Sequence, residues 1–130
     1  MGFKSFISNA TKQQNYMKDI YSNFWSKSRN RYGFIQQDKD LIKEFANCID
    51  NNGVILDVGI GDGHPFANQF NKMGYKIYGI DISPTHVSIV EKEFPNIVVA
   101  EGDAQNLEFP DNFFNGVYCF RSSWYFPDLE

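Results

Sequence analysis

Three aspartates stand at regular intervals in the second half of the sequence, where they could accept hydrogen bonds from one ligand. Asp57, Asp81 and Asp103 each lie at or just after the end of a short apolar run, at intervals of 24 and 22 residues. An ionised carboxylate accepts hydrogen bonds from hydroxyl and amino groups and donates none. The intervals match the length of one strand, one helix and their connections, so we expect each aspartate to follow a separate strand.

A glycine-rich segment surrounds the first of these aspartates. It reads Asp57-Val58-Gly59-Ile60-Gly61-Asp62-Gly63-His64-Pro65. Glycines between a strand and a helix let the backbone approach a ligand, because no Cβ stands in the way. We also expect the turn to aim free amide N–H groups at that ligand.

Two residues of this segment argue against a bound dinucleotide. The dinucleotide fingerprint would place its third glycine where this chain has His64, and Pro65 removes one N–H from the helix start that would hold a pyrophosphate. No Gly-Lys-Ser or Gly-Lys-Thr follows the glycines, so a Walker-type phosphate loop is excluded. A nicotinamide-dependent Rossmann enzyme is therefore a disfavoured alternative.

The elements that must position these residues alternate along the chain. Apolar runs over 54–58, 76–80, 97–100 and 116–120 predict four strands. Helical spacing after Pro65 and after the pair Ser83-Pro84 predicts two intervening helices. This order is typical of right-handed crossovers, so we expect a doubly wound, mostly parallel α/β sheet covered on both faces.

An N-terminal helical segment precedes the sheet. Apolar periodicity predicts one helix over 11–28 and a second that starts after Asp38 and carries Leu41 and Ile42 on its apolar stripe. We expect residues 1–52 to form this helical segment and residues 53–130 to form an α/β half-domain, both within one structural domain.

The predicted sheet brings the three carboxylates to one edge, because ligands of open α/β sheets lie outside the carboxyl ends of the strands. Asp81 is placed to accept both hydroxyls of a ribose, and Asp103 an amino group such as that of adenine. From residue 53 onward, four Lys and Arg face eleven Asp and Glu, which disfavours polyphosphate and nucleic acid. We therefore predict a ligand with a ribose, an adenine and a positive charge but no phosphate.

Four segments resemble the motifs of class I S-adenosylmethionine-dependent methyltransferases. Residues 55–63 resemble the first motif, residues 78–83 the ribose-binding motif, and residues 101–107 with 109–115 the adenine-side motif and the approach to the fourth strand. The resemblance covers roughly 53–128. It implies a Rossmann-like fold with S-adenosylmethionine as the cofactor.

The resemblance also implies roles for individual residues. The glycines would wrap the methionine portion, Asp57 would support its amino group directly or through water, and Asp81 would bind the ribose hydroxyls. Ile82 would pack on the adenine, Asp103 and the Ala104 backbone would bind the adenine edge, and the Phe120 carbonyl would accept from the methionine amino group. An aromatic residue of the N-terminal helices, Tyr16, Tyr21 or Trp25, would close over the cofactor. The implied cofactor-binding residues are therefore Asp57, Gly59, Gly61, Gly63, Asp81, Ile82, Asp103, Ala104, Phe120 and one of these aromatics. No residue is assigned as catalytic, and no metal site is expected.

Histidines and cysteines receive structural interpretations. We expect His64 to line the loop or cap the following helix rather than act as a base, and His86 to face solvent. Cys48 and Cys119 are interpreted as small buried apolar residues.

The predicted function is methyl transfer from S-adenosylmethionine to a small-molecule acceptor, or the cofactor-binding portion of such an enzyme. The alternative is a non-catalytic fragment that binds the cofactor or oligomerises. The family normally has seven strands in its sheet, and this chain stops just past the fourth, which would leave that strand at an edge. We therefore expect a truncated form of the fold, or a homodimer that covers this edge.

Composition sets the class of protein. With 130 residues, 42% of them hydrophobic, the chain is expected to fold as one globular domain. It contains no apolar run of the ~18 residues that span a bilayer and no signal peptide. Two cysteines give no indication of export, so we expect a cytoplasmic protein without membrane or nucleic-acid partners.

Overall fold

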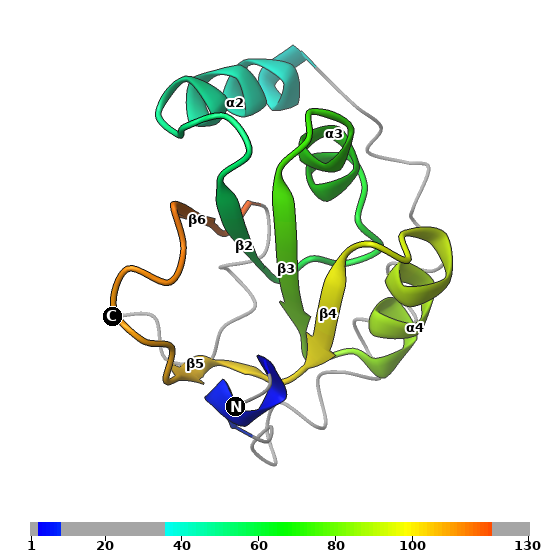
Figure 1. Ribbon diagram of the computed structural model, residues 1–130. Helices are drawn as coiled ribbons and strands as arrows, with labels where there is room; N and C mark the ends of the chain where they lie inside the picture. Colours follow the sequence, from blue (N-terminus) through cyan, green and yellow to red (C-terminus); the bar gives the residue numbers. More distant parts are fainter. Residues whose placement is uncertain (1–2, 9–35, 121–130) are drawn as a thin grey trace.

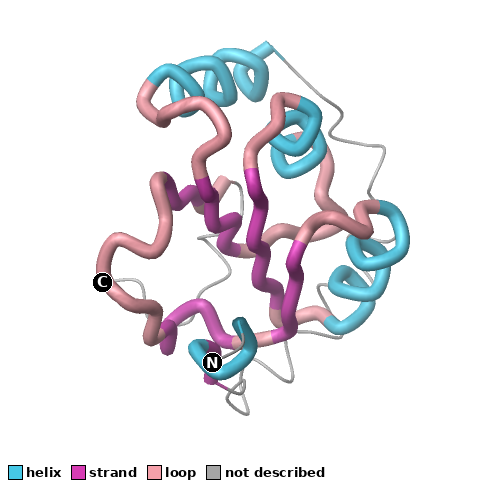
Figure 2. Tube along the Cα trace, in the orientation of Figure 1, coloured by secondary structure: helices cyan, strands magenta, loops and turns pink. Residues whose placement is uncertain are grey.

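The computed structural model describes residues 3–8 and 36–120 (Figures 1 and 2). The helix expected over 11–28 lies outside these residues. The elements, in chain order, are η1 (Phe3–Phe6), β1 (Ile7–Ser8), α2 (Gln36–Asn47), β2 (Val54–Val58), α3 (Phe66–Lys72), β3 (Lys76–Asp81), α4 (Pro84–Glu93), β4 (Val98–Glu101), β5 (Asp103–Leu107) and β6 (Gly116–Tyr118).

Four parallel strands form the central sheet in the order β4-β3-β2-β6. Val58 of β2 lies opposite Ile80 of β3, and Asp57 lies opposite Tyr118 of β6. All four apolar runs of the sequence become strands of this sheet, and the fourth ends at Tyr118, two residues earlier than expected. The predicted fold class, a Rossmann-like α/β sheet, is confirmed.

The helices α2, α3 and α4 pack against one face of the sheet (Figure 1). Ile42 of α2, Phe70 of α3 and Val90 of α4 belong to one buried cluster with Ile55 and Ile77 of the sheet. Phe70, Ile55 and Val90 have no exposed surface, so this side is a closed core. Among the described helices, none is both long enough and apolar enough to cross a membrane.

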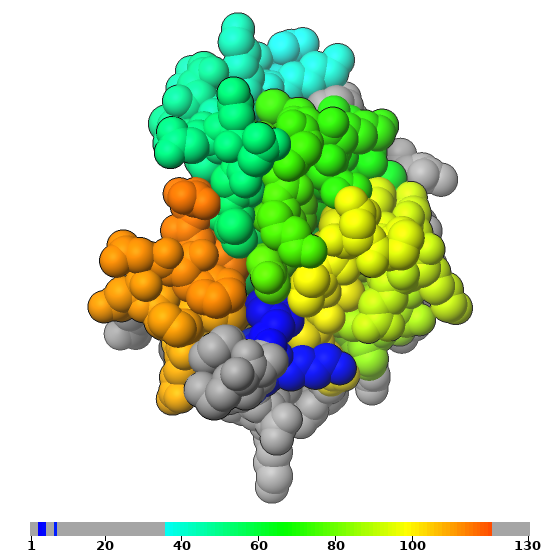
Figure 3. All heavy atoms as spheres, in the orientation of Figure 1, coloured from blue at the N-terminus to red at the C-terminus, as the bar shows by residue number. Residues whose placement is uncertain are grey.

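The second face of the sheet is covered differently from the first. Leu56, Val58 and Ile80 are buried there, and the described side chains packed on them include Phe3 of η1 and Phe109 of the loop after β5. β1 pairs antiparallel with β5 at the border of this face. In the space-filling view the N-terminal residues, in blue, lie against the orange segment that follows β5 (Figure 3). The short ladder was not predicted, because the polar sequence of β5 lacks an apolar β-branched run.

Helix α2 begins earlier than its apolar pattern indicates. It starts at Gln36, whose side-chain amide donates to the Asp40 carboxylate one turn later, at 3.0 Å. Asp38 therefore lies inside the helix and is buried, whereas Leu41, expected on the apolar stripe, is 44% exposed. The expectation of a buried Cys48 is also wrong, because Cys48 follows the helix and is exposed.

Candidate functional site

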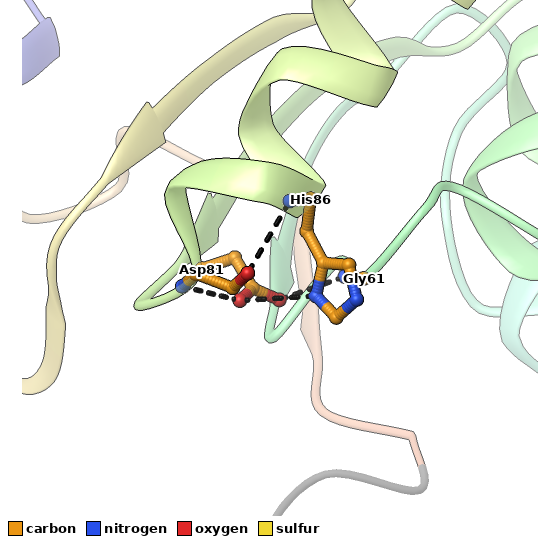
Figure 4. Close-up of polar contacts among 4 residues, drawn as sticks. Gly61, Asp81 and His86 are labelled. Carbon is orange, nitrogen blue, oxygen red and sulfur yellow. Dashed lines mark hydrogen bonds and ion pairs between the residues drawn. The ribbon is translucent and has the colours of Figure 1, made fainter. Parts of the chain in front are cut away.

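The turn after β2 and the end of β3 are tied together by one carboxylate. Asp81 Oδ2 accepts a hydrogen bond from the Gly61 amide at 2.9 Å, and Oδ1 accepts one from the Ser83 amide at 2.9 Å (Figure 4). Asp81 is the last residue of β3, and Ser83 is the N-cap of α4. The carboxylate thus joins the glycine turn to the start of a helix at the carboxyl edge of the sheet.

The glycine turn does not present the free amides that its sequence suggested. The Gly59 and Ile60 amides donate to the Ile80 carbonyl at 2.9 and 3.0 Å, and the Gly63 amide donates to the Ile60 carbonyl at 3.1 Å. With the Gly61 amide also engaged by Asp81, four amides of the turn are satisfied within the protein. The expectation of free N–H groups is therefore wrong for these four amides.

Two glycines of the turn have different surroundings. Gly61 has a φ of 61°, and a Cβ added there would meet no atom of the described residues within 4 Å, so open space lies beside it in this part of the structure. Gly63 has a φ of 86°, and an added Cβ would come within 2.7 Å of the Phe94 ring. A ligand can therefore approach the backbone at Gly61, whereas at position 63 both the positive φ and the nearby Phe94 ring favour a glycine.

Asp57 is held in the core beside the site. It is 4% exposed, and the Tyr118 hydroxyl of the neighbouring strand donates to its Oδ2 at 2.6 Å. Burial raises the pKa of Asp57 to about 7; the Tyr118 hydrogen bond acts against this rise, and the nearby Asp81 charge adds to it. Burial and the Asp57 charge raise the pKa of Tyr118 well above its usual value. A cation next to Asp57 would favour its ionised form.

Asp103 lies at the same edge of the sheet and is completely buried. The Gly102 amide donates to the Asp81 carbonyl at 3.0 Å, which fixes the chain just before Asp103 beside the end of β3. Its own carboxylate accepts from the Gln105 amide at 2.9 Å and from the Asn106 side chain at 2.6 Å. Asp103 therefore organises the start of β5 in addition to any contact with a ligand.

His86 is buried, so the expectation that it faces solvent is wrong. It is 5% exposed, and its Nδ1 lies 3.4 Å from Asp81 Oδ1 (Figure 4). The sequence contained a signal for this position, because His86 is the third residue after the N-cap Ser83, whose Oγ accepts from the His86 amide at 3.3 Å. Side chains at that position tilt back toward the helix start, where Asp81 lies.

His64 lies on the outside of the turn. Its Nε2 is 2.6 Å from Glu93 Oε1 at the end of α4, and both side chains are more than 40% exposed. The ring also contacts Phe94. Its side chain does not cap α3, whose N-cap position is Pro65 without a side-chain hydrogen bond. Of the two roles expected for His64, the structure supports only lining the loop.

The other expected site residues fall in three groups. Ile82 is half-buried beside Asp81, and Ala104 packs on the second-face cluster. The Phe120 ring stacks on Tyr118 at 4.7 Å and packs against Phe66 at 4.6 Å. The N-terminal aromatics Tyr16, Tyr21 and Trp25 lie outside the described residues. Within the described ranges, no group of three or more His, Cys, Asp or Glu side chains could hold a metal ion.

Comparison with known proteins identifies the family of this chain. Residues 55–130 match the model of a methyltransferase domain family. The chain is 40% identical over 75 residues to a demethylmenaquinone methyltransferase of Chlorobaculum tepidum, a match that covers 58% of this chain and 31% of that protein. It is 26% identical over 140 residues to a sterol 24-C-methyltransferase of Gibberella zeae, which covers 97% of this chain and 37% of the relative.

A solved structure shares the fold. The TehB-like SAM-dependent methyltransferase of Corynebacterium glutamicum superimposes with a TM-score of 0.60 at 21% identity, over 81% of this chain and 55% of that one. The present chain spans about a third of the length of both curated relatives. The family match covers the glycine turn and the aspartates Asp57, Asp81 and Asp103 at the carboxyl edge of the sheet. It shows that this chain belongs to the class I S-adenosylmethionine-dependent methyltransferases.

Proposed function

We propose that this chain binds S-adenosylmethionine at the carboxyl ends of β2 and β3 and serves the transfer of its methyl group to a small-molecule acceptor. The observation that carries the proposal is the Asp81 carboxylate, held by the Gly61 and Ser83 amides at the edge where β3 ends. Asp81 is largely but not fully buried, with 12% of its side chain exposed. It can therefore receive the hydroxyls of a ribose while its orientation stays fixed.

The residues present suit the parts of this cofactor. Open space beside Gly61 leaves room for the methionine portion against the turn. Asp57, next to the turn, would favour a positively charged amino group, directly or through water. Ile82 would contact the adenine ring, and Asp103 with the Ala104 backbone would meet the adenine edge.

Bound S-adenosylmethionine supplies an electrophilic methyl carbon: the acceptor atom forms a bond to it, and the carbon–sulfur bond breaks with its electron pair left on sulfur. The protein's contribution is positioning, which accounts for a large share of the rate when two reactants must align. In this chain the Asp57, Asp81 and glycine-turn contacts would fix one of the two reactants. The two curated relatives described above are named for a demethylmenaquinone and a sterol, which supports a small-molecule acceptor.

Loss of the Asp81 carboxylate should abolish most of the cofactor affinity. We expect Asp81→Ala to weaken S-adenosylhomocysteine binding by a few kcal/mol, because the ribose hydroxyls lose a charged acceptor. Isothermal titration calorimetry measures this change. Glu91→Ala, which removes one exposed acid from α4, is the matched control for net charge and should bind as the wild type does. Unchanged affinity of Asp81→Ala would refute the ribose assignment.

A titration and a turnover assay separate the alternative functions. NAD should not bind, because His64 and Pro65 depart from the dinucleotide fingerprint. Release of S-adenosylhomocysteine during incubation with candidate quinone, sterol and other small-molecule acceptors would establish turnover. Binding without any release would instead favour the non-catalytic fragment.

We further propose that the edge strand β6 pairs with a second copy of the chain. Within the described residues, β6 has one strand neighbour, β2, and its Val117 is 55% exposed. An exposed apolar edge favours pairing with another strand, and a charge on that edge opposes it. Sedimentation velocity should give a dimer at micromolar concentration and a monomer for Val117→Lys. A wild-type monomer would contradict the pairing.

A further inference from the structure

The buried imidazole of His86 lacks a hydrogen-bond partner for one of its ring nitrogens. No described group lies within hydrogen-bond distance and geometry of Nδ1, although that atom is shielded from solvent. A buried nitrogen without a partner costs free energy, so sites of this kind usually have a functional reason. His86 takes no part in the binding scheme above, and its ring lies beside the Asp81 carboxylate on which the scheme depends.

The position of the ring follows from the start of α4. Ser83 caps the helix and is fully buried, and its Oγ accepts from the His86 amide at 3.3 Å. The cap fixes the backbone of His86, and the tilt of side chains toward the helix start brings the ring back to Asp81. Nδ1 then lies 3.4 Å from Asp81 Oδ1, at least about half an ångström beyond a charge-assisted hydrogen bond (Figure 4).

Asp81 has acceptor capacity for this third donor. Its Oδ1 already accepts from the Ser83 amide and its Oδ2 from the Gly61 amide. A carboxylate offers more lone pairs than these two bonds use. A neutral imidazole can carry its proton on Nδ1, and a small approach of the ring would then satisfy the buried nitrogen.

We propose that His86 is a positioning residue for Asp81: its Nδ1–H donates to Oδ1, so that three protein donors fix the carboxylate and the remaining acceptor site, on Oδ2, is directed to the ribose. The inference rests on the proposed function, because the ribose is the ligand part that Asp81 is proposed to bind. His86 itself need not touch the cofactor. Its buried Nδ1 is closed to solvent and would act only through Asp81.

The substitutions Asn and Leu at position 86 form a matched pair. Both have the same branched shape, and Asn carries an amide nitrogen as many bonds from Cα as Nδ1 is in histidine. We expect His86→Leu to raise the dissociation constant of S-adenosylhomocysteine about tenfold, the usual effect of losing one hydrogen bond to a charged group. His86→Asn should bind S-adenosylhomocysteine nearly as tightly as the wild type, because its amide nitrogen can donate to Asp81. Equal affinities of the two variants would overturn the proposal.

A double-mutant cycle separates positioning from a general loss of structure. In an Asp81→Asn background the charge that strengthens the hydrogen bond from position 86 is gone, so His86→Leu and His86→Asn should bind the ligand with nearly equal affinity. Thermal unfolding of each variant measures its stability independently. A Leu-specific loss that persists in the Asp81→Asn background would show that His86 acts through packing and would overturn the proposal.

A ligand-free measurement keeps this test apart from the proposed function. Nitrogen-15 NMR of the full chain reports which ring nitrogen of His86 carries the proton. We expect the Nδ1–H tautomer, with a resonance that shifts in Asp81→Asn. An Nε2–H tautomer, or a resonance indifferent to Asp81→Asn, would overturn the proposed contact. Failure of the wild type to bind S-adenosylhomocysteine while the Nδ1–H tautomer is present would refute the proposed function alone.

Discussion

Asp57 and Asp81 stand at neighbouring strand ends, and their surroundings differ. Asp81 accepts two backbone N–H groups and keeps part of its side chain exposed, which suits a charged acceptor. Asp57 is enclosed by the core, and burial raises its pKa to about 7 despite the Tyr118 hydrogen bond. One acid is thus organised to receive hydroxyl groups, and the other changes charge near neutral pH.

The raised pKa of Asp57 predicts that the protein is less stable at neutral than at mildly acidic pH. Between about pH 4 and pH 7 the folded protein keeps this proton while the unfolded chain has lost it. The free energy of unfolding should therefore fall as pH rises through this window, by on the order of a few kcal/mol, and level off above it. Denaturant titrations at several pH values measure this slope.

Two substitutions test the assignment of this slope to Asp57. Asp57→Asn should remove it, because the amide does not titrate in this range. Tyr118→Phe removes the hydrogen bond that lowers the Asp57 pKa, so the fall in stability should extend to higher pH. A slope that persists unchanged in Asp57→Asn would assign it to another group.

The glycine turn between β2 and α3 illustrates how one motif combines two requirements. Gly61 borders open space, whereas the Cα of Gly63 faces the ring of Phe94, the C-cap residue of α4. Both have positive φ, which costs an alanine roughly 1–2 kcal/mol at either position. The extra contact at Gly63 adds steric overlap, so the two glycines should respond differently to the same substitution.

We expect Gly63→Ala to lower the free energy of unfolding more than Gly61→Ala, since only the former overlaps a ring. Gly61→Ala should instead weaken S-adenosylhomocysteine binding more strongly, because its Cβ would occupy the open space beside the turn. Chemical denaturation and calorimetry measure the two effects. Adding Phe94→Leu should recover part of the stability lost in Gly63→Ala, and the absence of recovery would contradict the packing explanation.

The four strands of the parallel sheet could be predicted from the sequence because apolar β-branched runs such as Val54–Val58 carry a strong local signal. The hydrogen bonds that the amides of the glycine turn donate could not be predicted, because they depend on the Ile80 carbonyl of another strand. The burial of His86 was not predicted for the same kind of reason. Helical spacing predicts only the side of α4 on which His86 lies, whereas its burial depends on the end of β3 at Asp81, which lies outside the pattern of the helix. Polar β5 carries no local strand signal and forms through its pairing with β1.

At the scale of the whole molecule, the two faces of the sheet are closed by different means. Helices cover one face, and in the described residues the other is covered by aromatic side chains of η1 and of the loop after β5. Phe3 lies 5.2 Å from Tyr78 and 5.6 Å from Phe109, measured between ring centroids. The N-terminal turn and the loop after β5 therefore stabilise the sheet jointly, on the side away from α3 and α4.

Removing the Phe3 ring should therefore destabilise the whole domain and leave the site intact. We expect Phe3→Ala to lower the free energy of unfolding by about 1–3 kcal/mol, less than for a fully buried phenylalanine because the ring is only half-buried. Phe113→Ala, on the exposed rim of the same aromatic group, should cost less. S-adenosylhomocysteine affinity, measured well below the unfolding transition, should stay near the wild-type value, because Asp81 and Gly61 lie at the carboxyl edge and not on this face. A selective loss of affinity in Phe3→Ala would show that the N-terminal turn supports the site as well as the sheet.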